Sequence, residues 1–297
     1  TDRRIVSVFD QTAAIWDAAS MADVFITTAD LANLLAAEHP VTLLDVRWQL
    51  SQPDGRADHE LGHLPGAVYV SLDDELTDHR VDGRGRHPLP SGSALQEAAR
   101  RWGVRRGVPV VIYDDWNLAG SARAWWVLRA AGIGDVRILD GGLRAWIAAG
   151  HALETGPVEA SPGDAVVLHE DLYAGAMPTL TADEAAGHPN LLDARAPERF
   201  RGDVEPMDPL AGHIPGARNL PSTAVLTAAG TLLADAEIAA LGWSFGGSDQ
   251  VGVYCGSGVT ASVLVAALAA AGVDAALFPG SWSQWSAEGR PVRTGDQ

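Results

Sequence analysis

The sequence predicts an α/β protein built from two tandem domains, each with a mostly parallel sheet and helices on both faces. Three observations predict this class. The chain has 297 residues, about the length of two ordinary domains. Four sequence elements occur twice in the same order, which indicates an internal repeat. Within each copy, short apolar runs alternate with stretches of helical periodicity, as in parallel sheets whose strands are joined by helices.

The repeat consists of pairs of similar segments. Because their order is kept and only the loops between them differ in length, a duplicated domain explains them. The segment LLDVR at 43–47 returns as LLDAR at 191–195, GHLPGA at 62–67 as GHIPGA at 212–217, VVIYD at 110–114 as VGVYC at 251–255, and DGGL at 140–143 as PGSW at 279–282.

The domain boundaries follow from the repeat. We expect a first domain at residues 24–150, a proline- and glycine-rich linker at 151–178 and a second domain at 179–291. Met21 is a candidate natural start, which would make residues 1–20 an extension. In the first copy, the pattern predicts strands at 43–46, 68–70, 110–113 and 136–139 and helices at 31–37, 93–102 and 122–131.

The composition narrows the functional classes. The net charge is −17, so nucleic acid and anionic membrane surfaces are poor partners. We expect neither a membrane span nor a signal peptide, because no apolar run is long enough. A single cysteine cannot form an internal disulfide, which fits a reducing compartment and predicts a cytoplasmic protein. The nine histidines are scattered, so no metal or other cofactor is expected.

The chain's only cysteine, Cys255, falls between an expected strand at 251–254 and an expected helix at 260–271. Gly256 and Gly258 allow a tight loop whose N–H groups turn toward the sulfur. The start of the helix adds partial positive charge, and both features favour an anion such as a thiolate. A lone cysteine is usually a small buried hydrophobic residue, but such a residue needs no glycine-rich loop around it. The loop therefore marks a candidate nucleophile.

The first copy differs at this place, because Asp114 stands where Cys255 stands in the second copy. An aspartate cannot act as a sulfur nucleophile, so the first domain is expected to lack the chemistry and to form a wall of the cleft. The GHLPG and GHIPG elements are interpreted as turns that lead into strands, which is the expected role of His213.

The duplicated domain, the GH[LI]PGA and DGGL elements and the CGSGVTA loop resemble the two-domain rhodanese sulfurtransferases. The loop is most similar to that of the 3-mercaptopyruvate sulfurtransferase branch, since thiosulfate-preferring rhodaneses more often carry basic residues just after the cysteine. The resemblance covers roughly residues 24–291. It implies two rhodanese-like domains with the active cysteine only in the second.

The resemblance implies a ping-pong sulfur transfer at Cys255. The thiolate takes a sulfane sulfur from 3-mercaptopyruvate or thiosulfate and becomes a persulfide. Cyanide, a small thiol or a protein thiol then removes that sulfur, and a thioredoxin-like reductant is a candidate acceptor. Ser257 is expected to donate a hydrogen bond to the sulfur or to the donor's carbonyl. Thr260 is expected to fix the loop or to act only as a helix cap. The expected binding residues of the loop are Gly256, Gly258, Val259 and Thr260.

The same branch uses two arginines for the donor's carboxylate and carbonyl, and Arg199 matches the first of them. The second is missing here, because Met207 and Asp208 follow the Glu-Pro element. Arg201 is either a replacement or a surface residue.

The branch is also thought to use a Ser-His-Asp relay that spans the two domains. By resemblance, Ser257 and His63 match the first two members, and the acid is either Asp54 or Asp58. Such a relay would polarise the serine hydroxyl and help to protonate the departing enolate.

Three alternatives stay open beside this reading. One is a thiosulfate-preferring rhodanese, and another is a non-catalytic rhodanese-like binding or sensing module, against which the intact cysteine loop argues. The third is a cysteine phosphatase, which needs an arginine six residues after the cysteine to clamp phosphate. Ala261 occupies that position, which disfavours phosphatase chemistry.

Overall fold

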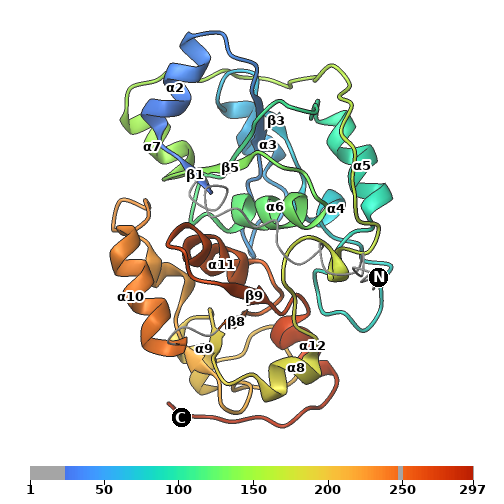
Figure 1. Cartoon of the computed structure of the whole chain (residues 1–297), viewed down its shortest axis with the longest axis vertical. Helices are drawn as coiled ribbons and strands as arrows, with labels where there is room; N and C mark the ends of the chain where they lie inside the picture. The colour runs from blue at the N-terminus through green and yellow to red at the C-terminus, as the bar shows by residue number, and fades with distance from the viewer. Residues whose placement is uncertain (1–23, 247–249, 297) are drawn as a thin grey trace, which may run out of the picture.

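The computed structural model describes residues 24–246 and 250–296, and the predicted fold class is confirmed (Figure 1). Two parallel sheets are present, each covered by helices on both faces. The candidate start at Met21 and the extension at 1–20 lie outside the described residues. Within the described ranges, no helix is long and apolar enough to cross a membrane.

The strands of the first domain lie in the order β1-β5-β4-β2-β3, and all pair in parallel. Successive side chains of a strand point to opposite faces of a sheet. Leu43 and Val111 therefore pack on one face, whereas Leu44 and Ile112 pack on the other. The strands are β1 (Phe25–Ile26), β2 (Thr42–Asp45), β3 (Val68–Tyr69), β4 (Val110–Tyr113) and β5 (Val136–Leu139).

Helices cover both faces of this sheet, with α2 and α7 on one side and α4, α5 and α6 on the other. The first of them begins earlier than predicted, because the Thr27 hydroxyl accepts a hydrogen bond from the N–H of Asp30 and caps the helix. The helices are α2 (Thr28–Ala36), α3 (Arg56–Leu61), α4 (Leu72–Glu75), α5 (Gly92–Arg101), α6 (Ala119–Ala130) and α7 (Gly142–Ala148).

The second domain repeats this plan with the strand order β7-β6-β8-β9, again parallel. Thr179 pairs with Leu277 at the edge where β1 lies in the first domain. The strands are β6 (Leu191–Asp193), β7 (Arg218–Asn219), β8 (Val251–Tyr254) and β9 (Ala275–Leu277). The helices are α8 (Ala182–Gly187), α9 (Pro197–Arg201), α10 (Asp235–Gly246), α11 (Thr260–Ala270) and α12 (Ser281–Ala287).

The two domains meet through α6 and α11, which lie side by side in the middle of the molecule (Figure 1). Apolar side chains cover α11 almost all round, as expected for a helix enclosed between a sheet and a neighbouring helix. Its buried residues and those of α6 belong to one continuous apolar core. The domains are therefore joined along the helices that follow β4 and β8, the strands that end in Tyr113 and Tyr254.

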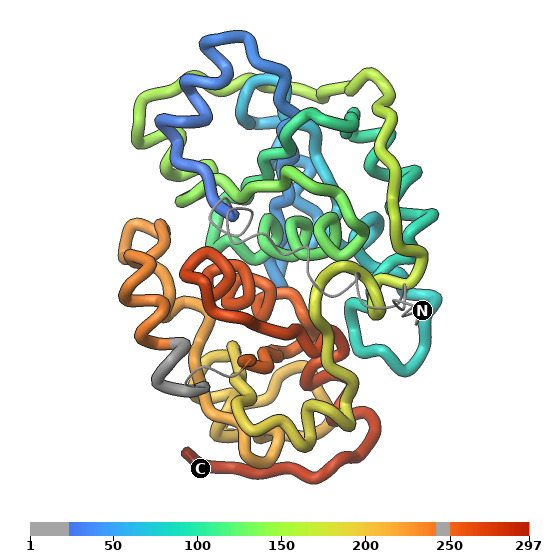
Figure 2. The backbone as a smooth tube through the Cα atoms, viewed as in Figure 1, coloured from blue at the N-terminus to red at the C-terminus, as the bar shows by residue number. Residues whose placement is uncertain are grey.

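The segment between the sheets runs along one side of the molecule (Figure 2). It holds a short 3-10 helix, Leu172–Ala174, and is pinned to the first domain by backbone hydrogen bonds from Gly163 to Arg100 (2.8 Å) and from Leu168 to Ala131 (2.8 Å). The loop at 82–87, which reaches the second domain, lies against this segment, because the Arg84 guanidinium stacks on the Tyr173 ring (4.6 Å to the centroid) and the N–H of Leu89 donates to the Tyr173 hydroxyl (3.0 Å).

Candidate active site

Cys255 directly follows β8, and α11 begins at Thr260, so the cysteine lies in a strand-to-helix loop at the carboxyl edge of the sheet. The cysteine is only 1% exposed, and the N–H of Gly258 donates a hydrogen bond to its Sγ (3.2 Å). Gly258 has φ of +80°, and an added Cβ would lie 2.4 Å from the carbonyl oxygen of Pro279. Only glycine fits this position, and the loop holds its sulfur beside a backbone donor.

The start of α12 fixes the loop from the other side. The N–H groups of Trp282 and Ser283 donate to the carbonyls of Cys255 (3.0 Å) and Gly256 (2.9 Å). The N–H of Cys255 donates to the Ser281 hydroxyl (3.1 Å), which in turn donates to the Phe278 carbonyl (2.9 Å). Four hydrogen bonds thus hold the backbone around the sulfur in place.

Ser281 takes a backbone conformation that favours glycine, with φ of +53°. Its counterpart in the first domain is Gly142, with φ of +54°. The second domain therefore keeps a serine at a position where a glycine would be less strained. The hydroxyl that binds the N–H of Cys255 explains this choice.

The other loop residues named from the sequence lie around the cysteine. Val259 is buried at the junction with α11, and Thr260 is the first residue of that helix and is partly exposed. Gly256 is buried, and a Cβ added there would lie 3.1 Å from Nη2 of Arg86 and 3.3 Å from Nη1 of Arg199. These residues shape the site through the backbone.

Ser257 contacts a histidine of the first domain. Its Oγ lies 2.7 Å from Nδ1 of His87, and Nε2 of His87 lies 3.3 Å from Oδ1 of Asp73. Burial lowers the pKa of His87, and the Asp73 carboxylate opposes this only in part. The hydrogen bond with His87 in turn lowers the pKa of Asp73. A neutral imidazole with its proton on Nε2 faces the carboxylate and leaves Nδ1 to accept from the serine hydroxyl.

This arrangement corrects the relay expected from the sequence, because His63 lies elsewhere. Its Nδ1 is 2.8 Å from the carbonyl oxygen of His59, its ring stacks on that of His59, and it is fully buried in the first domain. The repeat explains why: His213 makes the same contact with the Phe200 carbonyl (2.8 Å) and stacks on that ring. The histidine of the GH[LI]PG turn therefore has the same packing role in both domains.

The two acids proposed for the relay also lie away from Ser257. Asp58 accepts a hydrogen bond from the side chain of Gln52 (2.7 Å). Asp54 accepts from the N–H of Arg56 (2.9 Å) and from the hydroxyl of Tyr69 (3.0 Å). Both carboxylates contact residues around α3, and the carboxylate beside His87 is that of Asp73 instead of Asp54 or Asp58.

Arg123 of α6 holds the loop that carries His87. Its Nη2 donates to the carbonyl oxygens of His87 (2.9 Å) and Leu76 (3.2 Å), and the side chain is fully buried. Burial lowers the pKa of Arg123 to about 10, and the nearby Tyr173 and Cys255 act in the opposite direction. Arg123 is a positioning residue that sequence reasoning missed, because its role depends on contacts with a distant loop.

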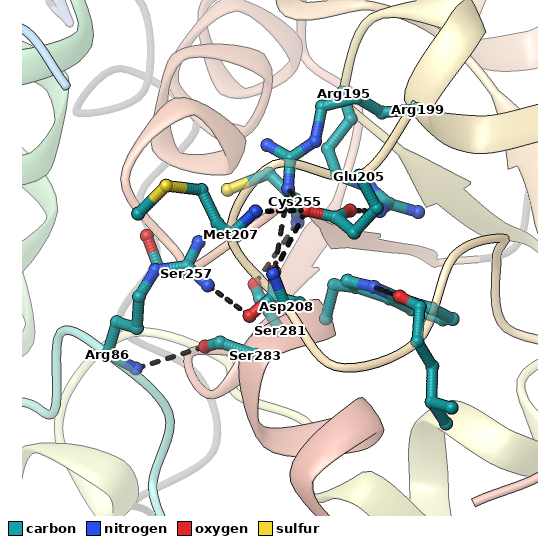
Figure 3. Close-up of polar contacts among 12 residues, drawn as sticks. Arg86, Arg195, Arg199, Glu205, Met207, Asp208, Cys255, Ser257, Ser281 and Ser283 are labelled. Carbon is teal, nitrogen blue, oxygen red and sulfur yellow. Dashed lines mark hydrogen bonds and ion pairs between the residues drawn. The ribbon is translucent and has the colours of Figure 1, made fainter. Parts of the chain in front are cut away.

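Arg199 approaches the cysteine loop from α9 (Figure 3). Its Nη2 forms ion pairs with Glu205 (2.6 Å) and Asp208 (3.4 Å). Glu205 also pairs with Arg195 (3.3 Å) and accepts the backbone N–H of Met207 (3.1 Å). The turn at 205–208 is thus tied to the guanidinium that faces the loop.

A second guanidinium, that of Arg86, reaches the same place from the first domain and pairs with Asp208 (Figure 3). Sequence reasoning missed this residue too. Arg201, by contrast, pairs with Asp203 (2.8 Å) on the outside of α9 and is a surface residue. The second cation near the loop is therefore Arg86 of the first domain and not Arg201.

The loop of the first domain surrounds a carboxyl group with backbone N–H groups. The Asp114 carboxylate accepts hydrogen bonds from the N–H groups of Trp116 (3.1 Å), Leu118 (3.1 Å) and Ser121 (3.0 Å). This loop precedes α6 as the cysteine loop precedes α11. Burial raises the pKa of Asp114, and these hydrogen bonds oppose that change, so the loop of the first domain directs its N–H groups toward a carboxyl as the cysteine loop directs one toward the sulfur.

No group of three or more histidine, cysteine, aspartate or glutamate side chains in the described ranges could hold a metal ion. The chemistry that the site offers comes from a buried thiol, a serine with a histidine acceptor, and two guanidiniums.

A protein family and several known proteins are similar to this chain. The family described as Rhodanese-like domain matches residues 27–149 and 179–288. A Mycobacterium tuberculosis protein provisionally named a thiosulfate sulfurtransferase, SseB, is 62% identical over 278 residues, which are 92% of this chain and 97% of that protein.

Solved structures are similar as well. The crystal structure of SseA from Escherichia coli, described as a 3-mercaptopyruvate sulfotransferase, has a TM-score of 0.75 and 32% identity, with 88% of this chain and 99% of that chain covered. A 3-mercaptopyruvate sulfurtransferase from Leishmania major has a TM-score of 0.78 and 29% identity, with 91% and 76% covered.

Proposed function

The chain belongs to the rhodanese family and is a two-domain sulfurtransferase, and on that premise we propose that its donor is 3-mercaptopyruvate. Sulfur passes through a persulfide on Cys255 to cyanide or a thiol. The observation that carries this proposal is the contact of Ser257 with His87, backed by Asp73, beside the cysteine loop. Ser257, His87 and Asp73 can pass a proton between them, and 3-mercaptopyruvate has both a thiol proton to give up and a carbonyl that can accept a hydrogen bond.

The half-reaction balances with the groups present. The Cys255 thiolate attacks the donor's sulfur, so that an S–S bond forms while the carbon–sulfur bond breaks and its electron pair leaves as the enolate of pyruvate. The donor's thiol proton passes through the Ser257 hydroxyl to Nδ1 of His87 and returns to the enolate. The products are pyruvate and an anionic persulfide, which the N–H of Gly258 stabilises.

The leaving group decides between the two donors. Sulfite leaves thiosulfate as a stable anion and takes no proton, so the relay gives thiosulfate no advantage. An enolate is a far stronger base and gains from a proton held ready at Ser257. A serine, a histidine and a carboxylate brought together from two domains therefore favour 3-mercaptopyruvate.

The acceptor must reach a sulfur that is almost enclosed, since Cys255 is only 1% exposed. Cyanide and small thiols fit this access better than a folded protein does. We propose a small thiol as the physiological sulfur acceptor, with a thioredoxin-like reductant as a slower alternative. A cytoplasmic setting, in which the thiol stays reduced, suits this cycle.

Initial rates with each donor, measured with cyanide as the acceptor, test the proposal. We expect a higher kcat/KM for 3-mercaptopyruvate than for thiosulfate. The name of the Mycobacterium tuberculosis relative makes thiosulfate the natural comparison. A higher kcat/KM for thiosulfate at equal pH and ionic strength would contradict the assignment of the donor and leave the sulfurtransferase activity standing.

Arg199 is predicted to anchor the donor's carboxylate. Its Nη1 would lie 3.3 Å from a Cβ built on Gly256, and its Nε has no hydrogen-bond partner among the described residues. Losing a charged hydrogen bond costs enough to raise KM in Arg199→Ala by about ten- to a hundredfold. Arg199→Lys should recover part of this, because lysine lacks paired donors. Steady-state kinetics check this, with Arg201→Ala as the matched control on the outside of α9. A normal KM in Arg199→Ala would remove Arg199 from the site.

A further inference from the structure

We propose that Arg123 of α6 is the counter-charge of the sulfur anion at Cys255, first of the thiolate and then of the persulfide. The inference rests on the persulfide of the proposed function, and it gives the first domain an electrostatic part in the reaction. Arg123 exchanges no proton or electron in this role, because its guanidinium stays protonated throughout. The bonds that form and break in the sulfur transfer are unchanged.

Arg123 is a fully buried guanidinium that has no carboxylate beside it. It forms no ion pair with an aspartate or a glutamate in the part of the chain that the structure describes. Nη2 donates to the carbonyl oxygens of His87 and Leu76, whereas Nε and Nη1 are buried and have no hydrogen-bond partner among the described residues. Burying a charge is costly unless an opposite charge compensates it, so this arginine needs a partner.

Two groups that can carry a negative charge act on Arg123, namely the hydroxyl of Tyr173 and the thiol of Cys255. Burial raises the pKa of Tyr173, and its oxygen accepts the N–H of Leu89 (3.0 Å). Tyr173 therefore stays a neutral phenol near neutral pH. Of these two groups, the sulfur of the nucleophile is the one that can supply the opposite charge.

Arg123 lies directly behind the loop that meets the nucleophile. The carbonyl that it binds belongs to His87 (2.9 Å), whose Nδ1 lies 2.7 Å from Oγ of Ser257, two residues after the cysteine. Cys255 and Ala122, the neighbour of Arg123 in α6, belong to one continuous buried core. Charges in a buried core attract each other more strongly than charges in water at the same distance. The guanidinium can therefore stabilise the sulfur anion without touching it.

The repeat shows that the fold does not need an arginine at this position. Strands β4 and β8 begin at residues 110 and 251 and helices α6 and α11 at 119 and 260, so the members of each pair are 141 residues apart. Leu264 of α11 is therefore the counterpart of Arg123, and it is fully buried as well. The domain that packs against the cysteine domain thus supplies an arginine, whereas the domain that packs against the Asp114 domain supplies a leucine.

Removing the charge tests the proposal. Arg123→Met removes the charge and the donors, and Arg123→Gln removes the charge but keeps a donor for the carbonyls of His87 and Leu76. In both variants we expect kcat/KM to fall by about tenfold or more with 3-mercaptopyruvate and by a similar factor with thiosulfate. The two donors should respond alike because the same thiolate attacks both.

Alkylation of Cys255 gives a second readout that does not depend on turnover. Cys255 is the chain's only cysteine, so the rate of reaction with iodoacetamide, an uncharged reagent, reports on this thiol alone. Because the thiolate is the reactive species, the rate at about pH 6 should fall by about tenfold in Arg123→Gln. Arg100→Gln removes the same charge from α5, where Nε donates to the Ala165 carbonyl (2.9 Å), and serves as the control with a normal rate.

A role of Arg123 that is limited to holding the His87 loop gives a different pattern. Arg123→Gln would then behave like His87→Asn, with activity lost for 3-mercaptopyruvate and kept for thiosulfate, and the alkylation of Cys255 would be unchanged. That pattern contradicts the proposal. Arg123→Lys serves if neither uncharged variant folds. It keeps the charge, so its alkylation rate should stay within about threefold of the original, and a tenfold loss would contradict the proposal.

The outcomes separate this inference from the proposed function. Unchanged alkylation and unchanged thiosulfate kinetics in an Arg123→Gln enzyme with a normal melting temperature would overturn the counter-charge and leave the persulfide standing. An unmodified enzyme that transfers sulfur without forming a persulfide on Cys255 would instead overturn the proposed function.

Discussion

Cys255→Ser is expected to abolish sulfur transfer from both donors, with a fall in kcat of more than about a thousandfold. Serine matches the size of cysteine, so the hydrogen bonds of Cys255 N–H and carbonyl with α12 should persist. A serine hydroxyl is neither ionised near neutral pH nor able to form a disulfide-like bond. Steady-state rates with cyanide as the acceptor measure the effect.

The control for this variant is its stability. A melting temperature close to that of the unmodified enzyme shows that the loss is chemical. No residue of the first domain can take over, because Asp114 stands at the equivalent position and its carboxylate is held by three backbone N–H groups. A Cys255→Ser enzyme with a tenth or more of the original rate would be incompatible with Cys255 as the nucleophile.

The second large effect is expected for His87→Asn, and it depends on the donor. We expect kcat with 3-mercaptopyruvate to fall by about a hundredfold or more, the usual size of a general acid–base contribution. The rate with thiosulfate should change little, because sulfite needs no proton. Ser257→Ala should behave in the same way, and the double variant should be no worse than either single one, since the two groups act as a unit.

His63→Asn is the matched control for His87→Asn. His63 is buried in the GHLPG turn and contacts the His59 carbonyl, so its replacement should lower stability and affect both donors equally. The relay would be refuted by a His87→Asn enzyme whose rates with the two donors fall by the same factor.

The pH profile adds a readout that a structural role of His87 would not give. Protonated His87 cannot accept the proton from Ser257, so kcat/KM for 3-mercaptopyruvate should fall as the pH drops through the pKa of His87. Burial lowers that pKa, which places the acidic limb below the ordinary value of 6.5. The limb should be missing with thiosulfate and in Ser257→Ala.

Much of the fold could be predicted because the repeat and the apolar runs are local signals. Strand β4 was expected at 110–113 and is found at Val110–Tyr113, and β8 was expected at 251–254 and is found at Val251–Tyr254. The cysteine loop was located by its two glycines, and Gly258 has the positive φ that the argument required. The apolar run of one β-strand and the glycines of one loop are visible in the sequence, so these elements can be located without knowledge of tertiary contacts.

The partners of the loop could not be predicted in the same way. Arg86 and His87 lie in an irregular loop without periodicity or a repeated counterpart, and they reach Ser257 and Asp208 only because α6 packs on α11. His63 attracted attention because the repeat makes it visible, yet repetition indicates a shared packing role. Contacts between domains depend on how the domains dock, which no local pattern encodes.

Mass spectrometry of the enzyme after a single turnover tests the central claim most directly. The enzyme is treated with 3-mercaptopyruvate in the absence of an acceptor, alkylated and digested. The account predicts one added sulfur atom per chain, located on the peptide that contains Cys255, with one pyruvate released and with the sulfur lost again on addition of cyanide. An unmodified Cys255 peptide in an enzyme that still releases pyruvate would contradict it.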